Sequence, residues 1–296
     1  WVATKVQRYE RVTFDYANRL EEKDQHELES IAIHHPLVTV FDALWEAAPA
    51  VFGNDIQALG LSPQDRVSPV DKSDVAAIYQ EISRVMGTRS TSLYLGKPEM
   101  YQGVLVACHA PPVMIVGRDA LAEPPSTLRF YMARALELTS PKFIFAAGLY
   151  AEDFTKFLAA LTRAFHPKYA RYQFKTLDPV DEKAQELKKL LPYRVSKIIV
   201  EFFNENANLT FDSGAWRKSV WMVGNRFGLL LTGYLQEAMR IVLYEETQRL
   251  PERFTQDELV SLCAQNPLLH DLFAFFVSPL HVQLRRHLGL ALHKDS

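Results

Sequence analysis

The side chains of this chain that could carry out chemistry have spacings that match no catalytic motif. The 296 residues include two cysteines, Cys108 and Cys263, and nine histidines. His281 and His287 are six positions apart, so a helix would turn them to different faces. The chain contains no H-E-x-x-H metal motif, no G-x-S-x-G nucleophile motif and no glycine loop for phosphates. On motifs alone, the sequence predicts no recognisable active site and no cofactor.

Charge and composition exclude several classes of function. The chain has 33 Lys and Arg residues against 35 Asp and Glu, a formal net charge of −2, which gives no general attraction to nucleic acid or to an anionic membrane. Its apolar runs are far shorter than the ~20 residues that a membrane-spanning helix needs. Two cysteines cannot form a disulfide framework. We therefore expect a cytoplasmic protein that binds no nucleic acid and does not insert into membranes.

The elements that would position any site are mostly helices. Apolar residues at helical spacing occupy 2–20, 37–48 and 71–86, and most of the chain after residue 126. Three short β-prone runs interrupt them, at 91–95, 103–107 and 113–117. We predict a mainly α fold with a small β-sheet (α+β), in which about three strands pack on a bundle that includes helices 128–138 and 216–232.

The domain organisation follows from one connector. Residues 53–70 are rich in proline and glycine and read as a boundary. We expect an N-terminal helical segment over 1–60, a main domain over 71–250 and a C-terminal helical layer over 251–296. Two residue types predict helix ends. Pro49 is expected to end the helix over 37–48, and Ser126 is a good N-cap for the helix after the strands.

The order of elements from residue 71 onward resembles the catalytic core of the minimal gluzincin metallopeptidases. This is the family of the CAAX prenyl endopeptidase and the heat-shock membrane protease. The resemblance rests on a helix, the strand Ser92–Leu95, the glycine-led strand 103–107, the strand 112–117 after two prolines, and the downstream run 226–233 (R-F-G-L-L-L-T-G). It covers about residues 71–245 and implies a zincin-like core.

The chemical residues of that family are replaced here. Placed on the family's zinc motif, Arg134 takes the position of the first histidine, Ala135 that of the general-base glutamate and Leu138 that of the second histidine. Trp221 falls on the glutamate ligand of the downstream helix, and Asn225 on its aspartate. Arginine stays protonated and does not ligate zinc, and zinc hydrolysis needs three protein ligands and a base. The resemblance therefore implies a pseudoenzyme without metal.

Two further expectations follow from the resemblance. Trp221 would fill the space of a metal and its water, so Trp221→Ala is expected to cost roughly 3–5 kcal/mol. The apolar helical stripe over 2–20 follows directly on Trp1, the first residue of the sequence. It resembles the last repeat helix of the tetratricopeptide-like repeat proteins of myxobacteria. That likeness implies that the chain is the C-terminal part of a longer bacterial helical-repeat protein.

Three functions remain open. The first is a non-catalytic pseudo-metallopeptidase domain for protein–protein interaction or assembly, bound to a protein partner or to other subunits. The second is a hydrolase or other enzyme that reuses the cleft, with His109, Arg134 and Glu137 as polar groups. The third is a purely structural helical scaffold.

For the first function, one strand is a candidate peptide-binding edge, because an edge strand can accept an added strand. Its residues carry no proline or lysine that would protect the edge, and they are Gly103, Val104, Leu105, Val106 and Ala107. Binding that is indifferent to Leu105→Pro would place the interface on the C-terminal layer around 268–292 instead.

Overall fold

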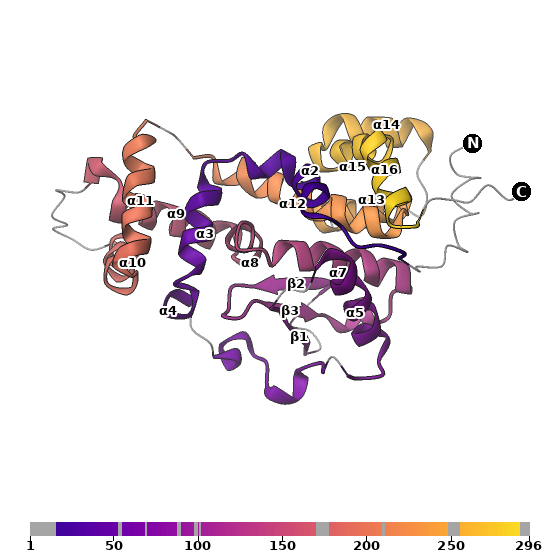
Figure 1. Ribbon diagram of the computed structural model, residues 1–296, viewed down its shortest axis with the longest axis horizontal. Helices are drawn as coiled ribbons and strands as arrows, with labels where there is room; N and C mark the ends of the chain where they lie inside the picture. Colours follow the sequence, from indigo (N-terminus) through magenta and orange to yellow (C-terminus); the bar gives the residue numbers. More distant parts are fainter. Residues whose placement is uncertain are drawn as a thin grey trace, which may run out of the picture.

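The computed structural model describes residues 16–52, 55–68, 70–87, 90–97, 100, 102–169, 178–208, 211–247 and 255–290. Most of the helical stripe expected over 2–20 lies outside these residues. The fold is mainly helical with one small mixed sheet, which confirms the predicted fold class (Figure 1).

Helices make up most of the described chain, and short 3-10 turns join some of them. The α-helices are α2 (Glu22–Ile33), α3 (Leu37–Trp45), α4 (Ala48–Phe52), α5 (Asp74–Met86), α6 (Arg118–Leu121), α7 (Pro125–Leu138), α8 (Ile144–Gly148), α9 (Ala151–Phe165), α10 (Pro179–Leu190), α11 (Tyr193–Glu205), α12 (Ser213–Thr232), α13 (Leu235–Thr247), α14 (Gln256–Gln265), α15 (Pro267–Phe276) and α16 (Pro279–His287). The strands are β1 (Ser92–Leu95), β2 (Val104–Ala107) and β3 (Val113–Val116).

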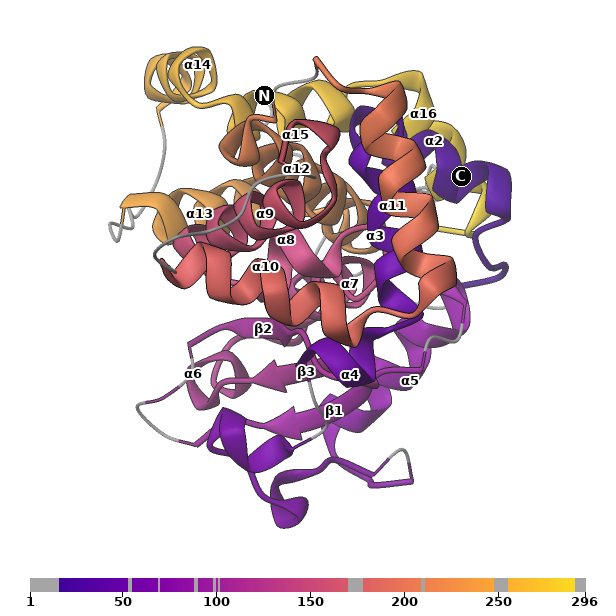
Figure 2. The same ribbon diagram turned by 90° about the vertical axis from the view of Figure 1, so that its left-hand side faces the viewer.

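The three strands form one sheet in the order β1–β3–β2, and they coincide with the three β-prone runs. β1 runs parallel to β3, whereas β2 runs antiparallel to it with Val104 opposite Val116. The outer side of β1 is partly paired, because the Val67 N–H donates to the Leu93 carbonyl at 2.9 Å. Figure 2 shows β2 as the strand nearest the helices and β1 as the strand farthest from them. β2 therefore lies at the edge that faces the helical layer.

Both faces of the sheet are covered. On one face, the strand residues join the main core with the helices; they are Leu93, Val104, Val106, Met114 and Val116. On the other face, a smaller cluster packs against the connector before α5; it comprises Leu61, Tyr94, Ala107, Val113 and Ile115. A strand covered on both faces reads as a continuous apolar run, and β3 is buried at all four positions.

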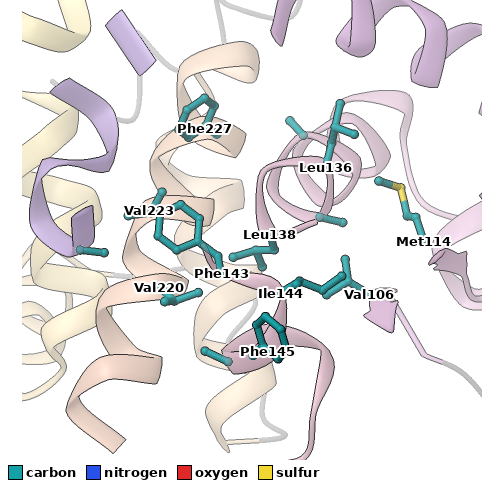
Figure 3. Packing of buried hydrophobic residues seen from close by; sticks show 14 of the residues in the cluster. Val106, Met114, Leu136, Leu138, Phe143, Ile144, Phe145, Val220, Val223 and Phe227 are labelled. Atoms are coloured by element: carbon teal, nitrogen blue, oxygen red, sulfur yellow. The ribbon is translucent and has the colours of Figure 1, made fainter. Parts of the chain in front are cut away.

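α7 is the central helix of the molecule. All its residues over 127–138 are buried, including the charged Arg129, Arg134 and Glu137. Figure 3 shows apolar residues of α12 on one side of this region and Val106 and Met114 of the sheet on the other. α12 therefore packs mainly on α7, on the side away from the sheet, whereas the sequence placed both helices against the strands.

α7 and α12 approach closely because α12 turns two glycines toward α7. A Cβ atom on Gly224 would lie 2.9 Å from Cγ of Arg134. A Cβ atom on Gly228 would lie 2.7 Å from Cδ2 of Phe130 and 3.0 Å from the Phe130 carbonyl oxygen. Residues four apart share a helix face, so both glycines serve the same interface. No larger side chain fits at either position without a shift of α7.

We expect Gly228→Ala to lower the free energy of unfolding by about 1–3 kcal/mol through overpacking, even though alanine is the better helix former. The added methyl group would overlap Phe130, whose backbone carbonyl cannot rotate away. Urea denaturation measures the change. Gly214→Ala on the same helix is the matched control, since the nearest atom to its new Cβ would be Oδ1 of Asp212 at 3.3 Å. Equal losses at the two glycines would contradict the close helix contact.

Two helix ends differ from the sequence-based expectation. The helix predicted over 37–48 ends at Trp45, and Pro49 lies in the first turn of the separate helix α4. Proline is tolerated there because first-turn N–H groups have no partner within the helix. α7 begins at Pro125 for the same reason, so Ser126 lies inside the helix and is not its N-cap.

One hydrophobic core runs through the described parts of all three expected domains. It includes Leu44 from the N-terminal segment, Phe227 from the middle of the chain and Leu272 from the C-terminal layer. The backbone also connects distant segments, since the Ala17 N–H donates to the Leu288 carbonyl at 2.9 Å. The three segments share one core, and their division into three domains stays a prediction.

A buried histidine lies in the C-terminal layer. The ring of His281 in α16 packs against Phe275 and Phe276, with centroid distances of 5.1 and 5.2 Å. Burial, together with the positive charge of Arg285, lowers the pKa of His281 to about 4. The folded protein therefore keeps this imidazole neutral at pH values where an unfolded chain would protonate it.

Stability should consequently fall as the pH drops from 6.5 to about 4. Over this range the unfolded chain binds a proton at His281 that the folded chain does not, so the free energy of unfolding decreases, by about 3 kcal/mol at the end of the range. His281→Leu should remove this part of the pH dependence, whereas His270→Leu at an exposed position of α15 should leave it. Urea denaturation at pH 7, 5.5 and 4.5 measures both. An unchanged pH slope in His281→Leu would disprove the assignment.

Candidate functional site

Four of the five residues at the positions that the resemblance aligns with a zinc motif come together between α7 and α12. The guanidinium carbon of Arg134 lies 5.1 Å from the ring centroid of Trp221. Nη1 of Arg134 donates to Oδ1 of Asn225 at 3.3 Å. The side chain of Leu138 lies against Gly224, one residue before Asn225. Ala135 is buried in α7 and takes no part in these contacts.

Arg134 is held by a carboxylate that motif analysis did not find. Its Nη1 donates to Oε2 of Glu245 in α13 at 2.7 Å, and its Nη2 donates to Oε1 of the same residue. Arg134 is only 2% exposed, whereas the side chain of Glu245 is 37% exposed. A buried cation needs a partner, but no sequence signal selects Glu245 from the other carboxylates of the chain.

Aromatic rings enclose the same guanidinium. Its carbon lies 5.1 Å from the Tyr131 centroid and 5.5 Å from the Phe130 centroid, in addition to its contact with Trp221. Such contacts between a cation and a ring face are attractive, and more so away from water. The rings and the carboxylate together fill the space around Arg134.

Neither Arg134 nor Tyr131 is prepared to act as a base or a nucleophile. Burial would lower the pKa of Arg134, but the charge and hydrogen bonds of Glu245 outweigh this effect and raise it. Burial, and then the negative charge of Glu245, raises the pKa of Tyr131. Arginine and tyrosine therefore both stay protonated at neutral pH, and the cluster acts as an ion pair within an aromatic enclosure.

Trp221 does not occupy the position expected for a buried replacement of a metal. It is half-buried and packs on the outside of the main core, and its ring lies over Arg134. The fully buried tryptophan of α12 is Trp216, one of the largest completely buried side chains. The expected loss of 3–5 kcal/mol for Trp221→Ala therefore belongs to Trp216, because only a fully buried ring leaves a full cavity.

The expected peptide-binding edge adjoins this cluster but is mostly covered. Tyr131 lies beside Gly103, 3.6 Å from a Cβ atom placed on it. The Gly117 N–H donates to the Gly103 carbonyl, so by alternation Val104 and Val106 direct their backbone groups away from β3. Both valines are buried, and α7 and α8 contact the strand. Only Leu105 is well exposed, at 40%.

The polar groups of the alternative enzyme hypothesis lie on two segments, with Arg134 and Glu137 in α7 and His109 after β2. His109 follows β2, and its Nδ1 lies 3.0 Å from the Pro111 carbonyl oxygen. Glu137 is completely buried in α7, while Arg134 is bonded to Glu245 and Asn225. Within the described ranges, no group of three or more His, Cys, Asp or Glu side chains is arranged to hold a metal ion.

Comparison with known proteins adds no relative. No protein-family model, curated protein or solved structure matches this chain. The resemblance to the minimal gluzincins therefore rests on the sequence motifs alone and stays a prediction. In the part of the chain that the structure describes, no helix has both the length and the apolar character needed to cross a bilayer.

Proposed function

We propose that this chain is a non-catalytic domain that binds a protein partner or other subunits of an assembly. The observation that carries the proposal is the ion pair between Arg134 and Glu245. It joins α7 to α13, and its Arg134 contacts Trp221 and Asn225 of α12, at positions that the resemblance aligns with the peptidases' zinc motif. Tight packing of the two helices around it supports a rigid frame rather than an open reaction site.

Exposed apolar side chains favour binding over a purely structural role. Four of them lie on the C-terminal layer, and they are Val260, Phe273, Val277 and Val282. Leu105 adds another beside the covered edge of β2. Phe273 and Val277 are four residues apart and share one side of α15. Exposed apolar residues that adjoin are typical of protein-binding sites, whereas single ones are ordinary.

The catalytic part of the proposal is tested with zinc and peptides. The purified chain is dialysed against zinc, analysed for bound metal, and incubated with a fluorogenic peptide library. We expect no stoichiometric zinc between α7 and α12 and no peptide hydrolysis. Zinc-dependent cleavage that Arg134→Ala or Trp221→Ala alters would overturn the proposal.

The binding part is tested by selecting peptides from a random displayed library against the same chain. We expect bound peptides that are recovered intact. Leu105→Pro then locates the surface, because it removes one donor of the β2–β3 ladder and bends the strand. Lost binding with a folded protein indicates the β2 edge. Retained binding that Val277→Asp abolishes indicates the C-terminal layer. A selection that yields no binder contradicts the proposed function.

A further inference from the structure

A cavity of about 450 Å³ opens where the parallel strands β1 and β3 begin. Its size falls within the range of pockets that bind small ligands. Four segments far apart in the sequence line it: the turn after α3, the residues before β1, the connection from β2 to β3 and the turn after α7. None of the residues of the Arg134 cluster takes part. The cavity is thus a second site, separate from the Arg134 cluster.

The walls of this cavity are largely apolar. Four prolines from three of its segments contribute rings and no N–H groups, and they are Pro49, Pro111, Pro112 and Pro141. Prolines also hold the backbone in fixed conformations, so the walls are stiff. A ligand with an extended aliphatic part would suit such a lining.

The two threonine hydroxyls of the lining, of Thr91 and Thr139, can accept hydrogen bonds from a ligand. Thr139 Oγ1 donates its proton to the Leu136 carbonyl at 2.7 Å. The 3.1 Å contact between Thr91 Oγ1 and Thr139 Oγ1 must therefore be donated by Thr91. Both hydroxyl protons are used within the protein, so these residues offer only lone pairs to the cavity.

Glu46 is the one charged residue of the described lining, and Trp45 stands next to it. The ring of Trp45 is held edge-on against Phe145, with a centroid distance of 5.9 Å. Glu46 already attracts a guanidinium, since Nη2 of Arg194 lies 3.4 Å from its Oε1. That pair is exposed, at 78% for Arg194 and 49% for Glu46, and exposed pairs of this kind bind weakly.

We propose that this cavity binds the side chain of an arginine presented by a protein partner; the source of the arginine rests on the proposed function above. The aliphatic part of the side chain would lie along the prolines. The guanidinium would contact the Trp45 ring and the Glu46 carboxylate. An aromatic ring face and a carboxylate are the two partners that a planar cation prefers. It would also donate to the lone pairs of the two threonine hydroxyls, and Arg194 would be displaced.

The test uses N-acetyl-arginine N-methylamide as probe and the citrulline analogue as its neutral isostere. Binding is followed by NMR through the indole signal of Trp45. We expect the arginine probe to bind and the citrulline probe to bind at least about tenfold more weakly, because the ureido group loses the attraction of the carboxylate and the ring. Equal binding of the two probes, or no binding of either, would overturn the proposal.

Variants at exposed positions sharpen the result without endangering the fold. Glu46→Gln should weaken binding of the arginine probe by about tenfold, whereas Arg194→Ala should strengthen it by about twofold because a competing cation is gone. Glu201→Gln, a carboxylate-to-amide change on α11 outside the cavity, is the matched control and should change nothing. Binding that ignores Glu46→Gln contradicts the assignment.

The peptide selection separates this inference from the proposed function. Selected peptides that are enriched in arginine and lose binding in Glu46→Gln support both. Selected peptides without arginine, unaffected by Glu46→Gln, overturn the inference and leave the proposed function intact. Binding of the arginine probe with no selected peptide contradicts the protein partner as the source.

Discussion

Glu245→Ala is expected to lower the free energy of unfolding by about 3–5 kcal/mol, because it leaves the charge of Arg134 buried without a partner. Arg134→Met should cost less, although Arg134 is the more buried residue. Its removal leaves a carboxylate that is 37% exposed and that water can solvate. Methionine can also pack among the rings that surround the guanidinium.

This asymmetry is measured by urea denaturation of the two single variants and the double variant. Glu246→Ala is the matched control, since it removes an exposed carboxylate one residue along the same helix. A double variant that resembles Arg134→Met would show that the unpaired arginine causes the loss. A greater loss for Arg134→Met than for Glu245→Ala would mean that aromatic packing, rather than charge, holds the cluster together.

Trp216→Ala is expected to cost about 3–5 kcal/mol, the usual loss for a fully buried large side chain. Its ring packs 4.5 Å from His35 and 6.1 Å from Phe41, so it joins α12 to the N-terminal helices. Trp221→Ala should cost about 0.5–2 kcal/mol, the range of a cation–π contact. Thermal and urea unfolding of both variants measure the difference.

The variant Trp216→Phe tests whether the loss in Trp216→Ala comes from the lost ring volume. Trp216→Phe keeps most of the ring volume and removes an indole N–H that has no hydrogen-bond partner, so it should cost less than Trp216→Ala. Equal losses for Trp216→Ala and Trp221→Ala would contradict the burial of the two residues and restore the original expectation for Trp221.

The sheet was predictable because its signals are local. Each strand is a short apolar run beside proline or glycine, and the three strands, Ser92–Leu95, Val104–Ala107 and Val113–Val116, lie within the predicted runs. The burial of the two tryptophans was not predictable from spacing. α12 carries apolar residues on nearly every face, so its pattern does not show which side meets the core.

The site was predictable only in part. The motif comparison singled out Arg134, Trp221 and Asn225, and these residues are in contact because helices α7 and α12 face each other. It could not select Glu245, which lies 111 residues from Arg134 along the chain. The cavity near Glu46 was not foreseen either, because four separate segments build it and no single segment carries a signal.

The burial of α7 on all sides has a consequence for how the molecule opens. A helix without a solvent-exposed face cannot open its hydrogen bonds by local fluctuation alone. Its amide protons therefore exchange only when the surrounding elements separate. Hydrogen exchange at residues 127–138 should therefore follow global unfolding, while amides of α14 exchange through small local openings. The helix that the resemblance aligns with the peptidases' zinc motif is therefore expected to contain the most slowly exchanging amides of the fold.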